Sequence, residues 1–484
     1  MDKNFVLNLA FKYVISVAKS KPYNIQMRAI LNEYSGELSD KKIYLKPYDG
    51  FKYIMRPILC KDFVYKSNLS TYRNFYIVSP SLYLYYTFQV FELYFDIIKD
   101  KQLFEYTNID IYYSGLVNNE FKNVKENSNF NNQYELYKNE QASYNDNYVL
   151  LTDIQNFFDS INVDMLLKKC RKLITTSRGV NAIKNLENLF ISVGIKTLPQ
   201  LHYSIASSLL SQIYLNDLTN KTNQLLKENN WVGVRFVDDF CINLNKNNSY
   251  KYINKFLHEY SSLLYKNNLN LNANKTKRLT PKKFNELISN NLSNESYETI
   301  DISFEQHLKY IKPKFSVNDS IKNKGDDLIN LSGMKFMDFV YDIKKIYIKY
   351  GLDIEKYNKK VKTYFSINNE DAQKVINHFI FSKLWQKLSE LDLKEILACK
   401  ELVFFDPIKF TTLYCLINSY IGNHKYKIFN EFDGFYPSSI RSLIIFEQLT
   451  IQTYISKKEF SDIKDRFREI DPYSINFFEQ YIFL

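Results

Sequence analysis

Residues 231–244 read Trp-Val-Gly-Val-Arg-Phe-Val-Asp-Asp-Phe-Cys-Ile-Asn-Leu, with two adjacent carboxylates, Asp238 and Asp239, between two apolar runs. Apolar residues occupy every second position on both sides of the pair: Val232, Val234, Phe236, Phe240, Ile242 and Leu244. A period of two is typical of β-strands, so the stretch predicts two strands joined by a tight turn. Adjacent negative charges repel, and a divalent cation would relieve that repulsion. A solvated acidic turn in a surface hairpin fits the same stretch.

A second stretch, residues 148–161, reads Tyr-Val-Leu-Leu-Thr-Asp-Ile-Gln-Asn-Phe-Phe-Asp-Ser-Ile. Its short apolar run is typical of a buried strand and ends at Asp153. If this strand and the hairpin are neighbours in one sheet, Asp153 and Asp238 converge at its edge. Two metal ions held about 3.5–4 Å apart by such carboxylates drive in-line nucleotidyl transfer.

Four segments resemble, in the same order, the catalytic motifs of reverse transcriptases. Asp-Ile-Gln-Asn-Phe-Phe-Asp-Ser-Ile at 153–161 is similar to the first motif, and Phe-Val-Asp-Asp at 236–239 to the aspartate-pair motif. Leu-Pro-Gln at 198–200, followed by Ser-Ser-Leu-Leu-Ser-Gln-Ile-Tyr-Leu at 207–215, resembles the intervening motif and its helix. Leu-Asn-Leu-Asn-Ala-Asn-Lys-Thr-Lys at 269–277 resembles the next motif, which ends in a Lys-Thr pair.

The resemblance implies a two-metal polymerase site. Asp153 and Asp238 would ligate two Mg²⁺ ions, for which Mn²⁺ could substitute. Asp239 would support them, and Ile154 would be a further contact at the metals. One metal would lower the pKa of the attacking hydroxyl, and the other would stabilise the leaving pyrophosphate.

The resemblance also assigns contacts with the deoxynucleotide. Phe158 would pack against the sugar and exclude a 2′-hydroxyl, and Gln200 would contact the nucleotide. Lys275 would protonate the pyrophosphate leaving group or neutralise its charge. Two plainer interpretations stay open, in which Phe158 belongs to the core beside Phe157 and Lys275 is a surface lysine on a strand edge.

One position departs from the family pattern. Leu201 follows the Leu-Pro-Gln motif where a glycine is usual, so close backbone approach is lost and ordinary processive copying is put in doubt. Reverse transcriptases of the abortive-infection type tolerate variation here, and Ser-Pro-Ser-Leu-Tyr at 79–83 resembles their helix entry. Several of these enzymes synthesise DNA without a conventional template or primer, and some prime from a tyrosine of their own.

Composition favours a soluble protein with a polyanionic partner. The 484 residues carry a net charge of +11, although AT-rich coding DNA would also enrich lysine. The five cysteines show neither metal-ligand nor disulfide spacing, which fits a reducing cytoplasm.

Within the apolar stretch 82–98, one polar stripe indicates a buried helix rather than a membrane span: Gln89, Glu92 and Asp96. We expect no secretory signal and a bacterial cytoplasmic location.

Residues 41–75 mix cationic and aromatic side chains, a combination that binds phosphates and stacks on bases. By resemblance this region is the fingers, and Arg73 is the candidate contact to the triphosphate. The segment supplies five candidate contacts to nucleic acid: Lys46, Lys52, Arg56, Lys61 and Lys66. A solvated charged loop fits the same residues.

These observations predict an α+β right-hand polymerase, with fingers and palm of reverse transcriptase type, followed by an all-α C-terminal domain resembling HEAT-like repeats. The expected parts are a helical and fingers region, an Asn-rich loop or insertion, a palm, a connector and a helical domain, at 1–115, 116–147, 148–285, 286–330 and 331–484.

The expected function is DNA polymerisation from dNTPs in bacterial anti-phage defence, primed by the protein, with an associated non-coding RNA or without a conventional template. The partners implied by the family are cDNA product, a structured RNA and further copies of the chain, with no membrane. Two alternatives stay open: a retron or group II intron-like enzyme that copies an RNA template, and a non-catalytic RNA-binding scaffold that retains the fold.

Overall fold

The computed structural model describes residues 2–20, 27, 30, 41–55, 57, 59–65, 72–98, 104–113, 130–201, 204–245 and 249–295. The chain divides into two compact units. The first comprises Met1–Ser16, Ser39–Leu59 and Ser81–Asn291, and the second Val17–Leu38, Cys60–Pro80 and Leu292–Leu484. The described part of the second unit centres on a two-stranded sheet of β1 (Leu59–Tyr65) and β2 (Tyr72–Val78).

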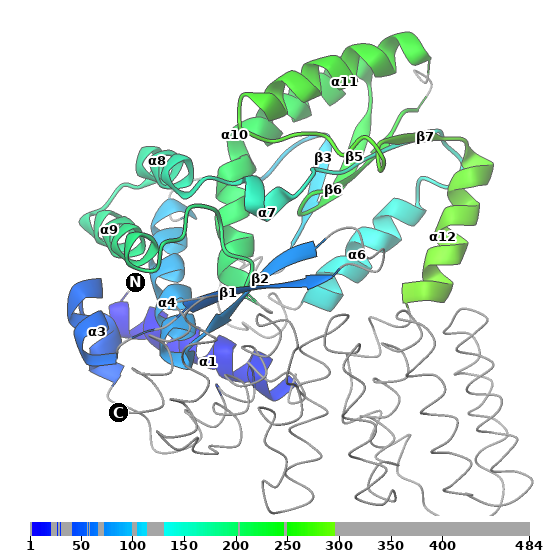
Figure 1. Cartoon of the computed structure of the whole chain (residues 1–484). Coiled ribbons are helices and arrows are strands. Elements are labelled where there is room, and N and C mark those ends of the chain that lie inside the picture. The colour runs from blue at the N-terminus through cyan, green and yellow to red at the C-terminus, as the bar shows by residue number, and fades with distance from the viewer. Residues whose placement is uncertain are drawn as a thin grey trace, which may run out of the picture. The chain divides into compact units, whose positions relative to one another are not determined.

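The first unit contains a five-stranded sheet (Figure 1). In spatial order its strands are β3 (Ile109–Tyr112), β5 (Val232–Phe236), β6 (Asp239–Asn243), β4 (Val149–Thr152) and β7 (Lys277–Leu279). β3 runs parallel to β5, and the other neighbouring pairs are antiparallel. The hairpin of β5 and β6 and its pairing with β4 confirm that the two acidic stretches share a sheet.

β5 and β6 are joined by a tight turn of Val237 and Asp238, which the pair Phe236–Asp239 closes. Val237 has a φ of 54°, in the left-handed region that a β-branched residue rarely adopts. Its backbone N–H donates to the carbonyl of Tyr112 over 3.3 Å, which ties the turn to β3. Conformations of this kind cost about 1–3 kcal/mol and persist where contacts with the surrounding structure hold them in place, often at functional sites.

Two helices cover one face of this sheet. α10 (Ile205–Asn229) supplies Gln212, whose Oε1 accepts a hydrogen bond of 3.0 Å from the buried Arg235 of β5. α11 (Tyr250–Tyr265) supplies Tyr260, whose ring lies 6.2 Å from that of Phe240 in β6. These contacts bury one face of the hairpin, because Arg235 and Phe240 are cross-strand partners on the same face.

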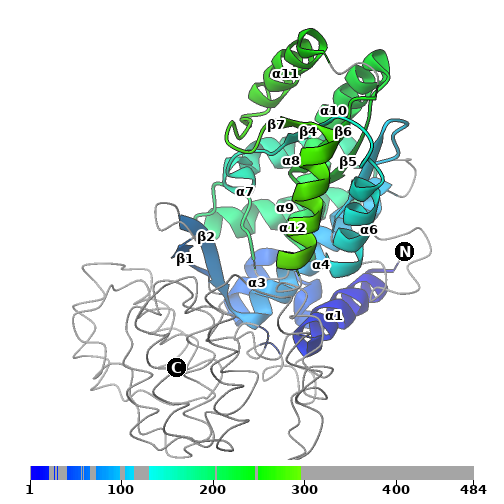
Figure 2. The same ribbon diagram turned by 90° about the vertical axis from the view of Figure 1, so that its right-hand side faces the viewer.

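The opposite face of the sheet carries α6 (Phe130–Ala142), and Figures 1 and 2 show α6 and α11 on opposite sides of the sheet. Tyr134 and Tyr137 of α6 lie with their ring centroids 5.0 and 5.7 Å from that of Phe236. Asp239 is the cross-strand partner of Phe236, so its carboxylate belongs to the α6 face.

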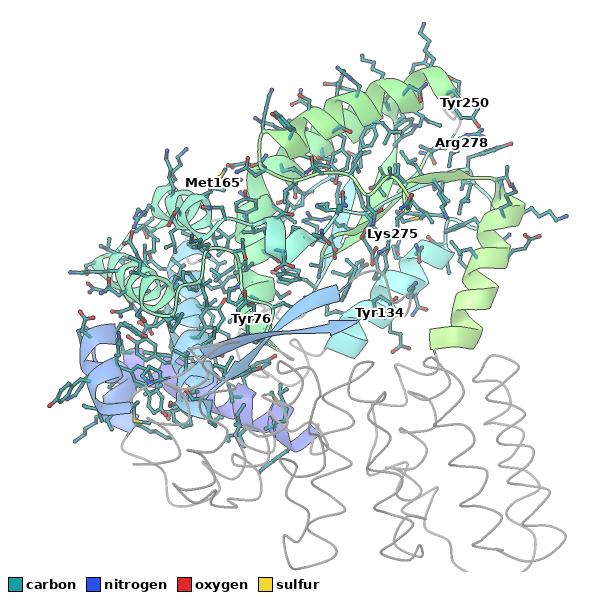
Figure 3. The ribbon with its side chains drawn as sticks, viewed as in Figure 1. Tyr76, Tyr134, Met165, Tyr250, Lys275 and Arg278 are labelled. Atoms are coloured by element: carbon teal, nitrogen blue, oxygen red, sulfur yellow. The ribbon has the colours of Figure 1, made fainter. Side chains whose placement is uncertain are left out.

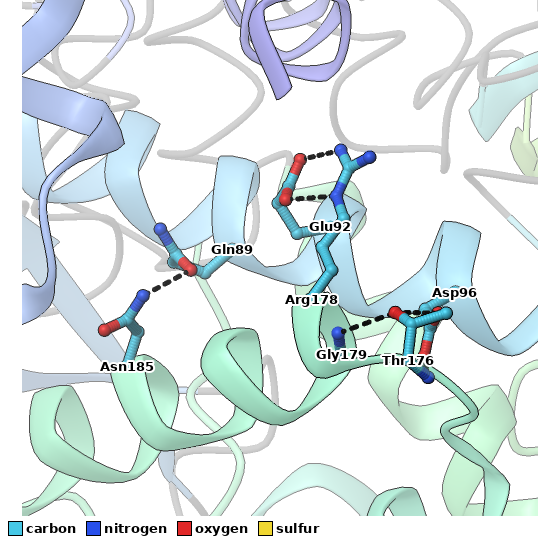
Figure 4. Close-up of polar contacts among 7 residues, drawn as sticks. All are labelled: Gln89, Glu92, Asp96, Thr176, Arg178, Gly179 and Asn185. Atoms are coloured by element: carbon cyan, nitrogen blue, oxygen red, sulfur yellow. Dashed lines mark hydrogen bonds and ion pairs between the residues drawn. The ribbon is translucent and has the colours of Figure 1, made fainter. Parts of the chain in front are cut away.

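α4 (Pro80–Ile98) is an almost completely buried helix, as its apolar sequence predicts. Its polar stripe meets α9 (Ser177–Ser192) and the segment before it (Figure 4). Every polar residue of the stripe has a partner there: Gln89 with Asn185, Glu92 with Arg178, and Asp96 with Thr175 and Thr176. The polar stripe therefore joins α4 to α9 and to the segment before α9 through hydrogen bonds and an ion pair.

The other described helices lie in the first unit, except that the first and the last of them extend past its boundaries at Ser16 and Asn291. They are α1 (Lys3–Ser20), the 3-10 helix η1 (Lys41–Leu45), α3 (Tyr48–Met55), α7 (Phe157–Ser160), α8 (Val163–Leu173) and α12 (Pro281–Glu295). No helix within the described ranges is long and apolar enough to cross a membrane.

The element boundaries differ from the expected parts at three places. β3 lies within 1–115 but joins the palm sheet, because four residues pair with the distant β5. The segment 116–147, expected to be a loop or insertion, contains α6, whose tyrosines pack against Phe236 of the sheet. α12 runs across the expected boundary at 285–286. The predicted helical domain at 331–484 lies outside the described residues.

Candidate active site

Asp153 and Asp239 meet at one edge of the sheet. Asp153 directly follows β4, and Asp239 is the first residue of β6. Thr152 pairs with Phe240 in antiparallel register. Asp153, which follows Thr152, therefore lies opposite Asp239, which precedes Phe240. Burial, followed by the charge of Asp153 and a side-chain hydrogen bond with it, raises the pKa of Asp239. The two strands are neighbours as expected, but the residue opposite Asp153 is Asp239, whereas Asp238, which was predicted to converge with Asp153, lies in the adjoining turn.

Burial and neighbouring carboxylates disfavour the ionisation of Asp238 and Asp239. Burial, followed by the charges of Asp239 and Asp153, raises the pKa of Asp238 to about 7. Burial and the charge of Asp153 raise the pKa of Asp239 to about 6, although Lys275 lowers it. Such a cluster carries more negative charge than its surroundings stabilise, so it favours binding of a cation.

The loop between α11 and β7 is bound to the backbone around Asp153. Gln155 donates its N–H to the carbonyl of Asn270 over 2.9 Å, and Ile154 forms a β-bridge with Leu271. These bonds extend the pairing of β4 with β7 past the end of β4. The motif at 269–277 is therefore held directly beside the first motif.

Two side chains of this loop reach the carboxylate of Asp153. Lys275 brings its Nζ within 3.3 Å of Oδ2, and Asn272 donates from Nδ2 to the same oxygen over 2.8 Å. Lys275 is labelled in Figure 3, and its side chain is 60% exposed. The loop thus places a cation at the boundary between the carboxylates and solvent.

The two phenylalanines after Asp153 have different environments. Phe157 is 3% exposed and belongs to the core, whereas Phe158 is half-buried. Asn156 precedes them in a left-handed conformation with a φ of 46°. Of the two aromatic rings, Phe158 is therefore the one available to a ligand.

The Leu-Pro-Gln segment lies beside the first motif as well. Leu198 donates its N–H to the carbonyl of Ile161 over 2.9 Å. The carbonyl of Pro199 accepts a hydrogen bond from Ser207 in the first turn of α10. Gln200 is half-buried, and Leu201, at the position where glycine is usual in this motif, is buried. The segment is anchored to α10, with Gln200 partly exposed beside it.

Two polar side chains at the site had no role in the sequence prediction. Asn272 lies in the run Leu-Asn-Leu-Asn at 269–272, where repeated asparagines give no functional pattern. Lys138 lies in α6, in a polar segment with little periodicity. Its Nζ is 5.1 Å from the ring centroid of Tyr134, and its charge lowers the pKa of Asp239. The tyrosines at positions 134 and 137, three residues apart, were the available sign of this helix.

The predicted basic residues that the structure describes do not gather at the carboxylates. Lys46 and Lys52 are exposed, the first just before α3 and the second on it, and no described contact joins either of them to the aspartates. Arg73 and Lys61 lie on β2 and β1, but their side chains are outside the described residues. The last two candidates are also outside them: Arg56 and Lys66.

The donor set at the sheet edge fits a hard divalent cation, because it consists of carboxylate and carbonyl oxygens. The side chain of Ile154 is buried and apolar, so its main-chain carbonyl is the oxygen that it can offer. Among the described residues, no group of three or more His, Cys, Asp or Glu is arranged to hold a metal ion. Mg²⁺ usually binds through one or two carboxylates and completes its shell with water and substrate phosphates, which fits Asp153 and the aspartate pair.

A comparison with protein families agrees with this geometry. Residues 113–304 match the family model described as reverse transcriptase (RNA-dependent DNA polymerase). No curated protein matches the chain. A solved structure of telomerase from Candida albicans, in complex with the TWJ fragment of telomeric RNA, is 12% identical with a TM-score of 0.32, over 87% of this chain and 68% of that chain. Residues 113–304, which include Asp153, Asp238, Asp239 and Lys275, therefore carry a reverse transcriptase domain.

Proposed function

We propose that the chain is a reverse transcriptase-like DNA polymerase that adds deoxynucleotides by two-metal nucleotidyl transfer. The observation that carries the proposal is the meeting of Asp153 with Asp239 across β4 and β6, with Asp238 in the adjoining turn. The raised pKa values of Asp238 and Asp239 support it, because a cation would relieve the crowding of charge.

Each residue at this edge has a role in the proposed reaction. Asp153 and Asp238 hold two Mg²⁺ ions, or Mn²⁺ in their place, with Asp239 in support. When bound, the metals activate the attacking hydroxyl and stabilise the charge of the pyrophosphate. Lys275 donates a proton to the leaving group or neutralises it. Phe158 excludes a 2′-hydroxyl.

The proposed biological role is bacterial anti-phage defence, in the cytoplasm. It rests on the resemblance of residues 79–83 to the abortive-infection type, and on Leu201 in place of glycine. In this role DNA synthesis is primed by the protein, with an associated non-coding RNA or without a conventional template, and copies of the chain form a homo-oligomer. The net charge of +11 supports a nucleic-acid partner.

A second candidate is an RNA-templated enzyme of the retron or group II intron type. The match of residues 113–304 to a family of RNA-dependent DNA polymerases favours it. It predicts that synthesis depends strictly on a dedicated RNA and yields ordinary cDNA. A non-catalytic RNA-binding scaffold predicts that the aspartates are dispensable for function.

One incorporation assay separates these functions. Purified protein with its co-purifying RNA is incubated with Mg²⁺ and each labelled dNTP or rNTP, and the products are resolved with and without protease or RNase. The variants are Asp238→Ala with Asp239→Ala, and Asp146→Ala as an exposed carboxylate control. A metal-dependent dNTP polymer that is lost in the double variant but not in Asp146→Ala supports the polymerase. Sensitivity of that product to protease supports protein priming. Loss of synthesis after RNase treatment, with a product that protease leaves unchanged, supports the templated enzyme. No incorporation by the wild type supports the scaffold.

A further inference from the structure

Asn272 contacts Asp153 through both its side chain and its backbone. Its Nδ2 donates to Oδ2 of Asp153 over 2.8 Å. Its backbone N–H donates to the main-chain carbonyl of Asp153, also over 2.8 Å. The two bonds reach the carboxylate and the backbone of one aspartate, so Asn272 restrains the orientation of that carboxylate relative to the strand.

The loop directs its side-chain donors to one oxygen of Asp153. Oδ2 accepts from Asn272, and the Nζ of Lys275 lies 3.3 Å from the same atom. Both of these contacts engage Oδ2 rather than Oδ1. The loop thereby limits rotation of the carboxylate and leaves Oδ1 as the oxygen for other partners of Asp153.

Asn272 also shapes the turn that carries Lys275. Its carbonyl accepts from the backbone N–H of Lys275 over 3.1 Å and from that of Thr276 over 2.9 Å. The hydroxyl of Thr276 donates to the same carbonyl over 2.9 Å. One residue therefore connects the aspartate of the first motif to the turn that presents the lysine.

We propose that Asn272 is a positioning residue for the nucleotidyl transfer proposed above. It holds Asp153 in the orientation in which the carboxylate can ligate a metal ion, and it holds the Lys275 turn against that carboxylate. The inference rests on the proposed function. Removing a partner that orients a ligating carboxylate typically costs about 10–100-fold in metal affinity or activity.

The test measures Mn²⁺ affinity by electron paramagnetic resonance on the full chain. Asn272→Leu keeps a similar volume and removes the donor, and Asn272→Ser keeps a hydroxyl that is too short to replace the amide. Asn274→Ala is the matched control, because Asn274 is an exposed asparagine of the same turn.

We expect Mn²⁺ affinity to fall about tenfold or more in both Asn272 variants and to change less than about twofold in the Asn274→Ala control. Raising the Mg²⁺ concentration should recover part of the lost DNA synthesis. Circular dichroism verifies the fold, and the serine variant decides if the leucine variant does not fold. Wild-type affinity in folded Asn272 variants, or no Mn²⁺ binding by the wild type, would overturn the inference.

The assay also separates this inference from the proposed function. If the wild type binds Mn²⁺ but makes no polymer, the proposed polymerase activity is refuted. The Mn²⁺ affinities of the Asn272 variants still decide the positioning role. An active wild type whose Asn272 variants bind Mn²⁺ normally refutes the positioning role alone.

Discussion

Lys275 and Asp153 form an ion pair in which Nζ lies 3.3 Å from Oδ2, although the two residues belong to the last and first of the four motifs. Burial alone would lower the pKa of Lys275, but the negative charges of Asp239 and Asp153 outweigh it and raise the pKa. The lysine is therefore protonated at neutral pH, which is the form that donates a proton or neutralises a leaving group.

Replacing Lys275 by alanine should slow nucleotide incorporation about 100-fold, because the leaving group loses its proton donor or neutralising charge. Lys275→Arg should retain the charge and most of the electrostatic contribution. Single-turnover incorporation at saturating dNTP and Mg²⁺ measures the effect. Lys277→Ala is the control, since Lys277 is exposed on the adjacent strand. Equal rates for Lys275→Ala and Lys277→Ala would assign Lys275 to the surface.

The raised pKa of Asp238 makes stability depend on pH. Because this pKa is about 7 in the folded protein and about 3.9 in an unfolded chain, the folded state binds the proton more tightly. Asp238 therefore penalises folding increasingly as pH rises from about 4 to about 7. In EDTA, Asp238→Asn should raise Tm relative to the wild type more at pH 8 than at pH 5.

Adding Mg²⁺ at pH 8 should reduce this difference, since the wild type gains a bound cation and the variant loses a carboxylate ligand. Thermal unfolding followed by circular dichroism gives all the comparisons. A Tm difference that is the same at both pH values would show that the ionisation of Asp238 is not coupled to folding.

Phe158 and Phe157 should respond differently to substitution. Phe158→Val should raise incorporation of rNTP relative to dNTP by about tenfold or more, because the proposed barrier to the 2′-hydroxyl is removed. Phe157→Ala should instead destabilise the fold by about 3–5 kcal/mol, because its side chain is buried. The kcat/KM ratio for matched rNTP and dNTP tests the first, and urea unfolding tests the second. An unchanged ratio in Phe158→Val would place Phe158 outside the sugar contact.

Removing Arg178 alone should destabilise the protein more than replacing both Glu92 and Arg178. Glu92 is 3% exposed, and Arg178→Met would leave its carboxylate buried without this partner. We expect a loss of about 3–5 kcal/mol in the free energy of unfolding. The double variant, Glu92→Leu with Arg178→Met, should recover most of the loss, as measured by urea unfolding. Equal losses in the single and double variants would contradict this account.

Local patterns in the chain were sufficient to find the strands of the site, the carboxylates and the buried helix at 82–98. Alternation of apolar residues marks β5 and β6, and a single polar stripe marks α4, because these periods follow from backbone geometry over a few residues. The order of the four motifs indicated the reverse transcriptase domain that the family match supports.

Long-range pairing settled the remaining features of the site. The antiparallel register of β4 and β6 places Asp239, rather than Asp238, opposite Asp153, and a shift of one residue would reverse the face of each side chain. The hydrogen bond from Asn272 to Asp153 likewise depends on the loop being bound beside β4. Neither relationship is encoded in the spacing of residues, because both arise from contacts between segments that are distant in sequence.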